Sequence, residues 1–198
     1  FKDVFAAGGF DVIVGNPPWG ADIKGDDRTY LSEIWTEAAD YESSQYFILK
    51  SLSLLNANGF IGVIIPNTFG LNVFAKTCRE SVLSHADVYS VTDLSDIDVF
   101  DDAGVRSIVI ILGPKRESKC HIYKMYSSPQ KLEELRTVSQ ETLLGAETWK
   151  VFLAKETQLT KIINRIIESH GTLSDICNVR QGYIPYRTTT LTERYGAA

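Results

Sequence analysis

The sequence predicts an α/β domain with a mostly parallel sheet. Short runs rich in valine and isoleucine alternate with segments of helical periodicity, and several of the runs end at a glycine or a proline. Continuous apolar strands of this kind are typical of a parallel sheet that helices cover on both faces. The expected strands are residues 10–14, 60–65, 88–94 and 107–112, and residues 120–125 return as an antiparallel neighbour of the last one.

Two helices are predicted to connect the first three strands. Residues 42–56 place four apolar side chains on one face, and Ser43 or Asp40 suits the N-cap position. Residues 71–83 repeat this pattern. The inward side chains are Phe47, Ile48, Leu52 and Leu55 in the first helix and Phe74, Cys78 and Val82 in the second. Residues 21–41 are polar and mixed, so we expect a long mobile loop there.

The periodicity changes beyond residue 128, and this change divides the chain into three regions. Residues 1–128 form the α/β domain, and residues 129–172 form a helical connector with helices over 131–138 and 155–169. Residues 173–198 begin with a strand-like run and stop without a further element. We therefore expect the beginning of a second domain in this last region.

The composition is typical of a globular protein, since 44% of the residues are hydrophobic and 23% are charged. No apolar run approaches the roughly 20 residues that span a bilayer, so we expect no membrane segment. Three widely spaced cysteines argue against a disulfide framework and against a zinc site. The acidic run from Asp93 to Asp102 lacks the spacing of a calcium loop, so no metal site is expected. Together these features predict a reduced, cytoplasmic protein.

The charge distribution bears on nucleic-acid binding. The formal net charge is −5, which argues against this segment as the main DNA grip, because phosphate contacts supply most non-specific affinity. Four basic residues surround a late turn, where solvation is the simpler interpretation and phosphate contact the alternative. They are Lys115, Arg116, Lys119 and Lys124.

The most informative motif follows the first strand directly and consists of Asn16, Pro17, Pro18 and Trp19. Ligands bind at the carboxyl ends of strands in open parallel sheets, so this is where a site is expected. Two consecutive prolines exclude a helix or strand interior and make the turn stiff. The motif therefore predicts a rigid turn that presents side-chain and backbone oxygens to a ligand.

These residue types suit methylation of an exocyclic amine such as that of adenine. The lone pair of that nitrogen is delocalised into the ring, so two fixed neutral acceptors are needed to bind its hydrogens and raise its nucleophilicity. The side-chain oxygen of Asn16 and the carbonyl of Pro17 can play these parts, and Pro18 extends the stiffness. A base flipped out of the duplex needs a stacking surface, which Trp19 can supply. The methyl donor would be a sulfonium cofactor.

Residues 10–19 resemble the catalytic motif of adenine-specific DNA methyltransferases. The resemblance extends over about residues 1–125, through Leu55–Phe69, Asp93–Phe100 and Val105–Leu112. It is closest to the gamma arrangement of single-chain type II restriction-modification enzymes, in which the cofactor motif precedes the catalytic one and a target-recognition domain follows. Residues 176–187 resemble the start of such a domain.

The resemblance implies a partial Rossmann-like sheet, S-adenosylmethionine as cofactor and double-stranded DNA with a flipped adenine as partner. Residues 1–128 would be the catalytic half of the methyltransferase domain, and residues 173–198 the start of target recognition. The family places an aromatic residue after the second strand against the flipped base; Phe74 is the better candidate and Phe69 the other, while packing in the core is the simpler interpretation of both. The glycine-rich cofactor motif is expected upstream of Phe1, so no cofactor-binding residue is assigned. The chain lacks an initial methionine, and we expect it to be part of a larger enzyme and inactive alone. The sequence does not indicate the oligomeric state.

Two other functions fit the same residues. Protein-glutamine and RNA-guanine amino-methyltransferases use related turns of Asn, Pro, Pro and an aromatic residue, because the nitrogen chemistry is the same. A non-catalytic DNA-binding or assembly module that keeps an inactive methyltransferase fold is the other alternative. The acidic charge and the missing cofactor motif favour this second alternative, whereas the downstream likeness to a target-recognition domain favours the DNA methyltransferase.

Overall fold

The computed structural model describes residues 1–38, 42–100, 105–127 and 130–155 and a few positions beyond them. Residues 1–155 form one compact unit, and residues 156–198 form a second unit of which few residues are described. The predicted helix over 155–169 and the predicted start of a target-recognition domain fall largely outside the described residues. No helix in the described part is long and apolar enough to cross a membrane.

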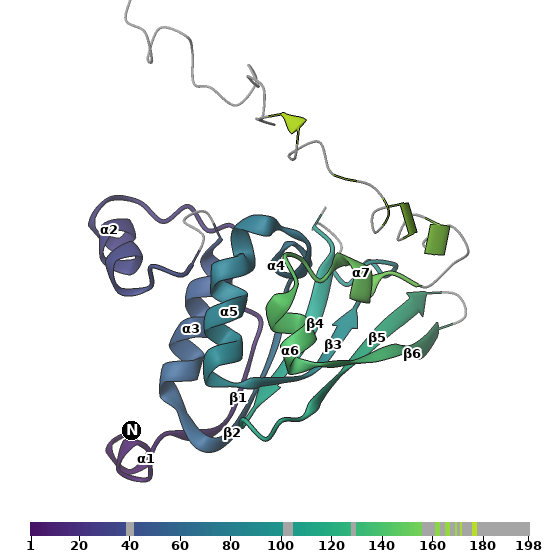
Figure 1. The fold of residues 1–198 in the computed structure, drawn as a ribbon. Coiled ribbons are helices and arrows are strands. Elements are labelled where there is room, and N and C mark those ends of the chain that lie inside the picture. The colour runs from purple at the N-terminus through teal and green to yellow at the C-terminus, as the bar shows by residue number, and fades with distance from the viewer. Residues whose placement is uncertain are drawn as a thin grey trace, which may run out of the picture. The chain divides into compact units, whose positions relative to one another are not determined.

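The first unit is built on one sheet of six strands in the order β1-β2-β4-β3-β5-β6 (Figure 1). The pairs β1–β2 and β3–β5 are parallel, while β4 runs antiparallel to both β2 and β3, and β6 runs antiparallel to β5. The strands are β1 (Phe10–Gly15), β2 (Leu55–Pro66), β3 (Asp87–Asp93), β4 (Ser107–Gly113), β5 (Lys119–Ser127) and β6 (Gln130–Ser139). As a consequence, β1, β2, β3 and β5 run in the same direction, and their C-terminal ends lie along the same end of the sheet.

The α/β class is therefore as predicted, but two details of the sheet are corrected. Residues 120–125 pair in parallel with β3 instead of antiparallel with β4. Residues 131–138, predicted to be helical, lie in β6, which forms a hairpin with β5. Leucine, lysine and glutamate favour a helix locally, but the edge of β5 offers a complete ladder of backbone hydrogen bonds, and this tertiary pairing overrides the local preference.

The helices are α1 (Lys2–Ala6), α2 (Gly25–Ile34), α3 (Ser43–Leu54), α4 (Thr68–Leu71), η1 (Val73–Ala75), α5 (Lys76–His85), α6 (Gln140–Gly145) and α7 (Lys150–Leu153). The predicted helix over 42–56 corresponds to α3, which Glu42 caps through a bond from the Ser44 amide. Of its predicted inward side chains, Ile48 is buried, whereas Phe47 is 49% exposed. The segment 21–41, predicted to be a loop, contains α2, none of whose residues is buried. A helix without a buried face has no apolar periodicity, so no pattern in the sequence indicated α2.

The predicted helix over 71–83 is divided in two. The backbone of Asn72 is extended, and its side chain accepts a hydrogen bond from the amide of Phe74, so the chain turns before α5 begins. Cys78 and Val82 are buried as predicted, but Phe74 is 68% exposed instead of inward. The hydrogen bond to the Asn72 side chain replaces a backbone hydrogen bond of a continuous helix, and asparagine side chains commonly compete with helices in this way.

The core lies between the sheet and the helices α3, α5, α6 and α7, which occupy one of its faces in the described part of the chain (Figure 1). The inward side chains of β2 and β4 are fully buried there, among them Ile61, Ile65 and Ile108. On the opposite face Ile64 and Ile111 are only half-buried. The sheet is thus not covered on both faces by the described helices, which corrects the expectation of two helical layers.

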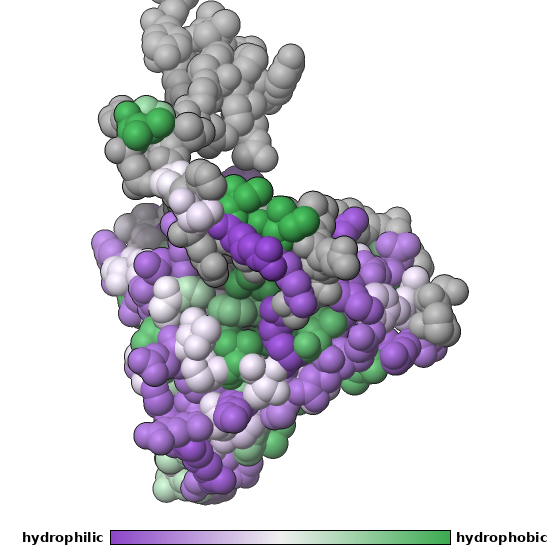
Figure 2. Space-filling view, turned by 45° about the vertical axis from the view of Figure 1, so that its right-hand side comes forward, coloured by the Kyte–Doolittle hydropathy of each residue, from purple (hydrophilic) through white to green (hydrophobic). Residues whose placement is uncertain are grey.

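The first strand also differs from its prediction as a buried run. Val12 is 60% exposed and Val14 is 78% exposed, while Ile13 packs against the core. The reason is the strand order, because β1 lies at the edge of the sheet and, within the described residues, pairs only with β2. In the view of Figure 2, apolar residues gather in the middle of the surface, with hydrophilic residues along its margins.

Candidate active site

The Asn16–Trp19 segment lies at the sheet edge where the parallel strands end. It follows β1 directly, and Asn67 after β2 and Asp93 at the end of β3 lie at the same edge. Pro17 is buried, whereas Asn16 and Pro18 are exposed and Trp19 is half-buried. The next residue, Gly20, has φ +57, a left-handed conformation that glycine adopts without the steric cost of a side chain. The turn therefore buries one proline as an anchor and leaves the Asn16 side chain accessible.

The turn borders a cavity of about 260 Å3. Its described lining consists of Asn16, Pro17, Pro18, Trp19 and Phe100. All five side chains are neutral; Trp19 and Phe100 contribute aromatic surface, and Asn16 contributes a side-chain amide. Such a lining suits an uncharged, flat ligand with polar hydrogens at one edge.

Residues at the N-terminus of α3 are hydrogen-bonded to the turn and to the two residues that follow it. The Ser43 hydroxyl donates to the Pro18 carbonyl at 2.6 Å and accepts from the Ala21 amide at 3.0 Å. The Glu42 carboxylate accepts from the Gly20 amide at 3.4 Å and from the Ser44 hydroxyl at 2.9 Å. Ser43 is buried, so both of its bonds are shielded from water. The backbone on both sides of Trp19 is thus fixed by α3.

The indole of Trp19 is held by two further contacts. Its Nε1 donates to the Ile64 carbonyl of β2 at 3.4 Å. Its ring meets that of Phe100 with a centroid distance of 5.2 Å and an interplanar angle of 81°. This edge-to-face arrangement is a favourable aromatic geometry. Trp19 is therefore oriented by β2 on one side and by the loop after β3 on the other.

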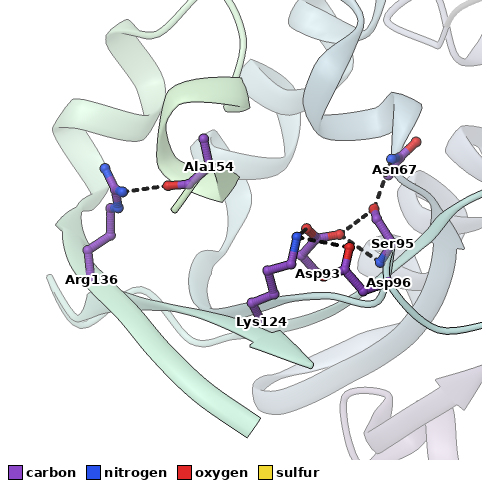
Figure 3. A network of polar contacts seen from close by, with 7 residues as sticks. All are labelled: Asn67, Asp93, Ser95, Asp96, Lys124, Arg136 and Ala154. Carbon is purple, nitrogen blue, oxygen red and sulfur yellow. Dashed lines mark hydrogen bonds and ion pairs between the residues drawn. The ribbon is translucent and has the colours of Figure 1, made fainter. Parts of the chain in front are cut away.

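A polar network connects the ends of β2, β3 and β5 beside this site (Figure 3). The Asn67 side chain donates to the Ser95 hydroxyl, which donates to the Asp93 carboxylate. Lys124 Nζ lies 3.4 Å from Asp93 and 3.2 Å from Asp96. Burial alone would lower the pKa of Lys124, but these two carboxylates outweigh it and raise the pKa above its usual value. The network fixes the start of the loop that carries Phe100.

The segment after β2 is anchored by the buried side chain of Arg79. Its guanidinium donates to the carbonyls of Phe69 at 2.6 Å, Asn72 at 2.9 Å and Glu147. It also lies over the ring of the buried Trp149, at 5.7 Å from the centroid. Arg79 thereby joins the α4–η1 segment, which presents Phe74, to the residues that precede α7.

The two cysteines of the first unit are chemically inert in this setting. Cys78 and Cys120 are both buried. Burial raises the pKa of the Cys78 thiol to about 12, and the nearby Glu37 carboxylate adds to this effect. Burial likewise raises the pKa of Cys120 to about 12. Neither is a thiolate at neutral pH, so neither is placed to act as a nucleophile.

The structure brings together four of the five residues that the sequence predicted for the site. Asn16, Pro17, Pro18 and Trp19 share one cavity, while Phe74 is exposed on η1 and is not part of the described lining. Two residues were missed. Ser43 was expected to cap a helix and instead holds the motif, and Phe100 lies 81 residues from Trp19, so no local pattern pointed to it.

A second cavity, of about 370 Å3, lies between α2 and α3. Tyr30 and Trp35, two aromatic residues of the segment after the Asn16–Trp19 motif, line this second cavity together with Ile34 and Tyr46. They do not line the cavity at Asn16. The two aromatic residues therefore border the space between α2 and α3.

Comparison with known proteins identifies the family. The Eco57I restriction-modification methylase family matches residues 1–100, which include the Asn16–Trp19 motif, Ser43 and Phe100. The chain belongs to this family. The resemblance to restriction-modification methyltransferases that the sequence indicated is confirmed at this level.

Individual relatives agree with this family. The putative type II restriction enzyme and methyltransferase RM.MjaORFECS2P of Methanocaldococcus jannaschii is 29% identical over 127 residues, which cover 64% of this chain and 10% of that protein. The type II restriction enzyme and methyltransferase RM.Eco57I of Escherichia coli is 22% identical over 190 residues, which cover 87% of this chain and 18% of that protein. The Eco57I-family chain thus spans less than a fifth of these two relatives.

Among solved structures, the sheet is similar to that of a modification subunit of a putative type I restriction enzyme from Vibrio vulnificus YJ016. The TM-score is 0.50 at 15% sequence identity, over 63% of this chain and 27% of that one. At this level of identity the likeness concerns the fold alone. It supports the prediction of an α/β domain that contains part of a methyltransferase-type sheet.

Proposed function

We propose that Asn16, Pro17 and Trp19 form the amine-binding site of a DNA methyltransferase that acts on the exocyclic amino group of adenine. The observation that carries the proposal is the grouping of Asn16, Pro17 and the rings of Trp19 and Phe100 around one small cavity, on a turn that Ser43 holds by two hydrogen bonds. Membership of a restriction-modification methylase family supports DNA as the substrate.

The turn supplies what an aromatic amine needs in order to react. The Asn16 side-chain oxygen and the Pro17 carbonyl accept the two amino hydrogens and draw the nitrogen from a planar towards a tetrahedral geometry. Its lone pair then becomes available, and the proton that the nitrogen loses on methylation leaves to solvent. Preorganised acceptors of this kind cost little reorganisation during the reaction, and the Ser43 clamp keeps the turn preorganised.

The methyl donor in this proposal is S-adenosylmethionine. When bound, it supplies an activated methyl group whose carbon–sulfur bond breaks, with both electrons left on sulfur, as the amine forms its new bond. The lining of the cavity fits the positive charge of such a donor, because carbonyl oxygens and aromatic faces attract a cation without attacking it. We assign no residue of this chain to the adenosine part of the donor.

The inert thiols favour direct transfer to an amine. Methylation at a ring carbon requires covalent attack by a protein nucleophile, and the two described thiols of the first unit have pKa values of about 12. Neither thiol lies among the residues that line the cavity. Amine methylation needs no such attack, in agreement with the neutral lining.

A base inside a duplex reaches this cavity only after it has flipped out. Trp19 is the stacking surface that compensates for the lost base stacking, a contribution of about 1–3 kcal/mol for a base on an aromatic ring. Phe74, exposed on η1 after β2, is proposed to contact the displaced nucleotide from outside the cavity. The basic residues Lys115 and Arg116 lie where β3 begins, at the opposite edge, so they are not placed to hold DNA at this site.

The proposal is tested by methyl transfer from labelled S-adenosylmethionine to adenine-containing duplex DNA. The full natural polypeptide that includes these residues is compared with its Asn16→Ala variant and with Asn58→Ala, an exposed asparagine near the start of β2. We expect a rate about 100- to 1000-fold lower for Asn16→Ala, the usual effect of removing one preorganised hydrogen-bonding group, and an unchanged rate for the control.

The other outcomes identify the alternatives. Cofactor binding without label on DNA would contradict the proposal and favour a protein or RNA substrate. Absence of cofactor binding would indicate a non-catalytic module with an inactive methyltransferase fold. Full activity of Asn16→Ala would show that the amine lies elsewhere.

A further inference from the structure

We propose that the chain has a second binding site, for the phosphate group of a small molecule, in a cavity at the opposite end of the sheet from Asn16. The cavity has a volume of about 430 Å3 and lies between the start of β2, the end of α5 and the turn that joins β4 to β5. This inference goes beyond the proposed function and does not depend on it.

The ionisable side chains in the described lining of this cavity are all basic. They are His85, Lys115 and Arg116, and the described lining contains no aspartate or glutamate. Lys115 and Arg116 are two of the four basic residues that the sequence gathers around this turn, whereas Lys119 and Lys124 are not among the described lining residues. A hollow surface with basic groups of one sign favours an anion as its ligand.

The two cationic side chains keep hydrogen-bonding capacity for a ligand. Lys115 Nζ donates to the Leu83 carbonyl at 2.8 Å, which uses one of the three ammonium hydrogens. This bond also places the ammonium at the C-terminal end of α5, where it offsets the partial negative charge of the helix. Arg116 donates to the Asn58 side chain at 3.2 Å, which uses one of the five guanidinium hydrogens. The remaining hydrogens can serve an anion.

The third basic residue comes from a different element. His85 Nδ1 lies 2.8 Å from the Ser81 carbonyl, which can only accept, so Nδ1 donates and Nε2 is the ring nitrogen that can meet a ligand. The basic groups thus approach from α5 and from the β4–β5 turn, and Arg116 adds a planar fork of donors. A phosphate group presents oxygens in several directions, so it suits this arrangement better than a planar carboxylate does.

The turn that carries Lys115 and Arg116 is held in one shape by the buried Asp87. The Asp87 carboxylate accepts from the amides of Arg116 and Ser118, both at 2.9 Å, and from the Ser118 hydroxyl at 3.0 Å. Between these residues, Glu117 has φ +54, a left-handed conformation that is uncommon for a residue other than glycine. Burial alone would raise the pKa of Asp87, but the three hydrogen bonds outweigh it and lower the pKa. The Asp87 charge is therefore engaged within the turn, which is formed before any ligand binds.

The position of the cavity favours a small molecule over the DNA proposed to bind at Asn16. The two cavities are separated by the length of β4, whose seven residues span about 20 Å. A nucleotide flipped into the cavity at Asn16 is too short to place its own phosphate at Lys115. The volume lies in the range of small-molecule sites, and apolar side chains offer a surface to the organic part of the ligand. They are Leu52, Leu55 and Pro114.

The experiment measures whether phosphate protects Lys115 from acetylation in the full natural polypeptide. The protein is treated with an acetylating reagent at increasing concentrations of inorganic phosphate, with chloride added to keep the ionic strength constant. Mass spectrometry then gives the extent of acetylation at each lysine. Lys119 is the internal control, because it is an exposed lysine of β5 outside the described lining. Thermal unfolding shows that each variant is folded.

We expect phosphate to slow the acetylation of Lys115 and to leave that of Lys119 within about twofold, because exposed charges are screened at physiological salt. Arg116→Gln should raise the phosphate concentration for half-protection about tenfold, since hydrogen bonds to a charged group are lost. His85→Ala, on another element, should raise it about threefold. Lys119→Gln, which removes the same charge as Arg116→Gln, should change it by less than about twofold.

The contrary outcomes are specific. Equal protection of Lys115 and Lys119, or an unchanged half-protection concentration in Arg116→Gln, would overturn the site. Protection of Lys115 by duplex DNA, with a salt dependence of DNA binding that is shallower by about one in Arg116→Gln, would show a DNA backbone contact and overturn the assignment to a small molecule. Methyl transfer enters neither readout, so a failure of this inference is distinguishable from a failure of the proposed function.

Discussion

Ser43 offers the sharpest prediction about how the fold supports the site. Replacing it by alanine removes the hydroxyl that donates to the Pro18 carbonyl at 2.6 Å and accepts from the Ala21 amide at 3.0 Å. Each hydrogen bond contributes about 1 kcal/mol net, so the ordered turn loses about 2 kcal/mol relative to alternative conformations. That energy corresponds to a change of up to about 30-fold in the population of the ordered turn.

The assay is single-turnover methyl transfer by the full natural polypeptide, together with thermal unfolding. We expect Ser43→Ala to lower the rate between about threefold and 30-fold. The upper value applies if no other interactions keep the turn ordered. A loss of 2 kcal/mol lowers the melting temperature by about 4–8 °C for a domain of this size, so the rate is measured well below unfolding.

A matched control distinguishes the loss of the two Ser43 hydrogen bonds from the general effect of replacing a serine by alanine. Ser84 is an exposed serine near the end of α5, and its hydroxyl donates to the Ser81 carbonyl at 2.6 Å. Ser84→Ala should leave both the rate and the melting temperature nearly unchanged. A rate for Ser43→Ala within twofold of the wild type would refute the idea that α3 holds the turn for reaction.

Three further predictions concern the groups around the site. Lys124→Met should lower the free energy of unfolding at neutral pH by about 1–3 kcal/mol in chemical denaturation; because the folded pKa of Lys124 is raised, the difference from wild type should persist below the usual lysine pKa and fade as the pH rises through the folded value. Its persistence at high pH would contradict the ion pairs. Arg79→Met should lower the free energy of unfolding by about 3–5 kcal/mol, because three carbonyls lose their donor at about 1–3 kcal/mol each; a cost below 1 kcal/mol would show that these bonds do not matter. Cys78 and Cys120 should resist alkylation by iodoacetamide in the folded protein at pH 8 and react after denaturation; rapid labelling of the folded protein would contradict their burial.

The parts of the fold that the sequence predicts correctly are those that local patterns determine. The run before Asn16, two consecutive prolines and an aromatic residue identify the turn without any knowledge of the rest of the chain. The helix α3 and the strand β2 follow from apolar periodicity and from the glycine and proline at their ends. The candidate site was predicted to this extent because its reactive groups are adjacent in sequence.

The parts that were missed depend on contacts between distant residues. The exposure of Val12 and Val14 follows from the position of β1 at the lateral edge of the sheet. The order of the strands cannot be predicted from the sequence of any one strand. The hairpin of β6 with β5 overrides a helical composition. Phe100 joins the site from a loop whose acidic sequence carries no aromatic pattern, and the start of that loop is held by hydrogen bonds to Asp93 of β3 and Ser107 of β4.

The most direct test of the central claim is the identity of the methylated atom. DNA treated with the full natural polypeptide and labelled S-adenosylmethionine is digested to nucleosides, and the labelled product is identified by mass spectrometry. Transfer to the amine held by Asn16 and Pro17 predicts label in N6-methyladenine, absent from the Asn16→Ala reaction. Label in a ring-carbon product such as 5-methylcytosine, undiminished in Asn16→Ala, would contradict the account.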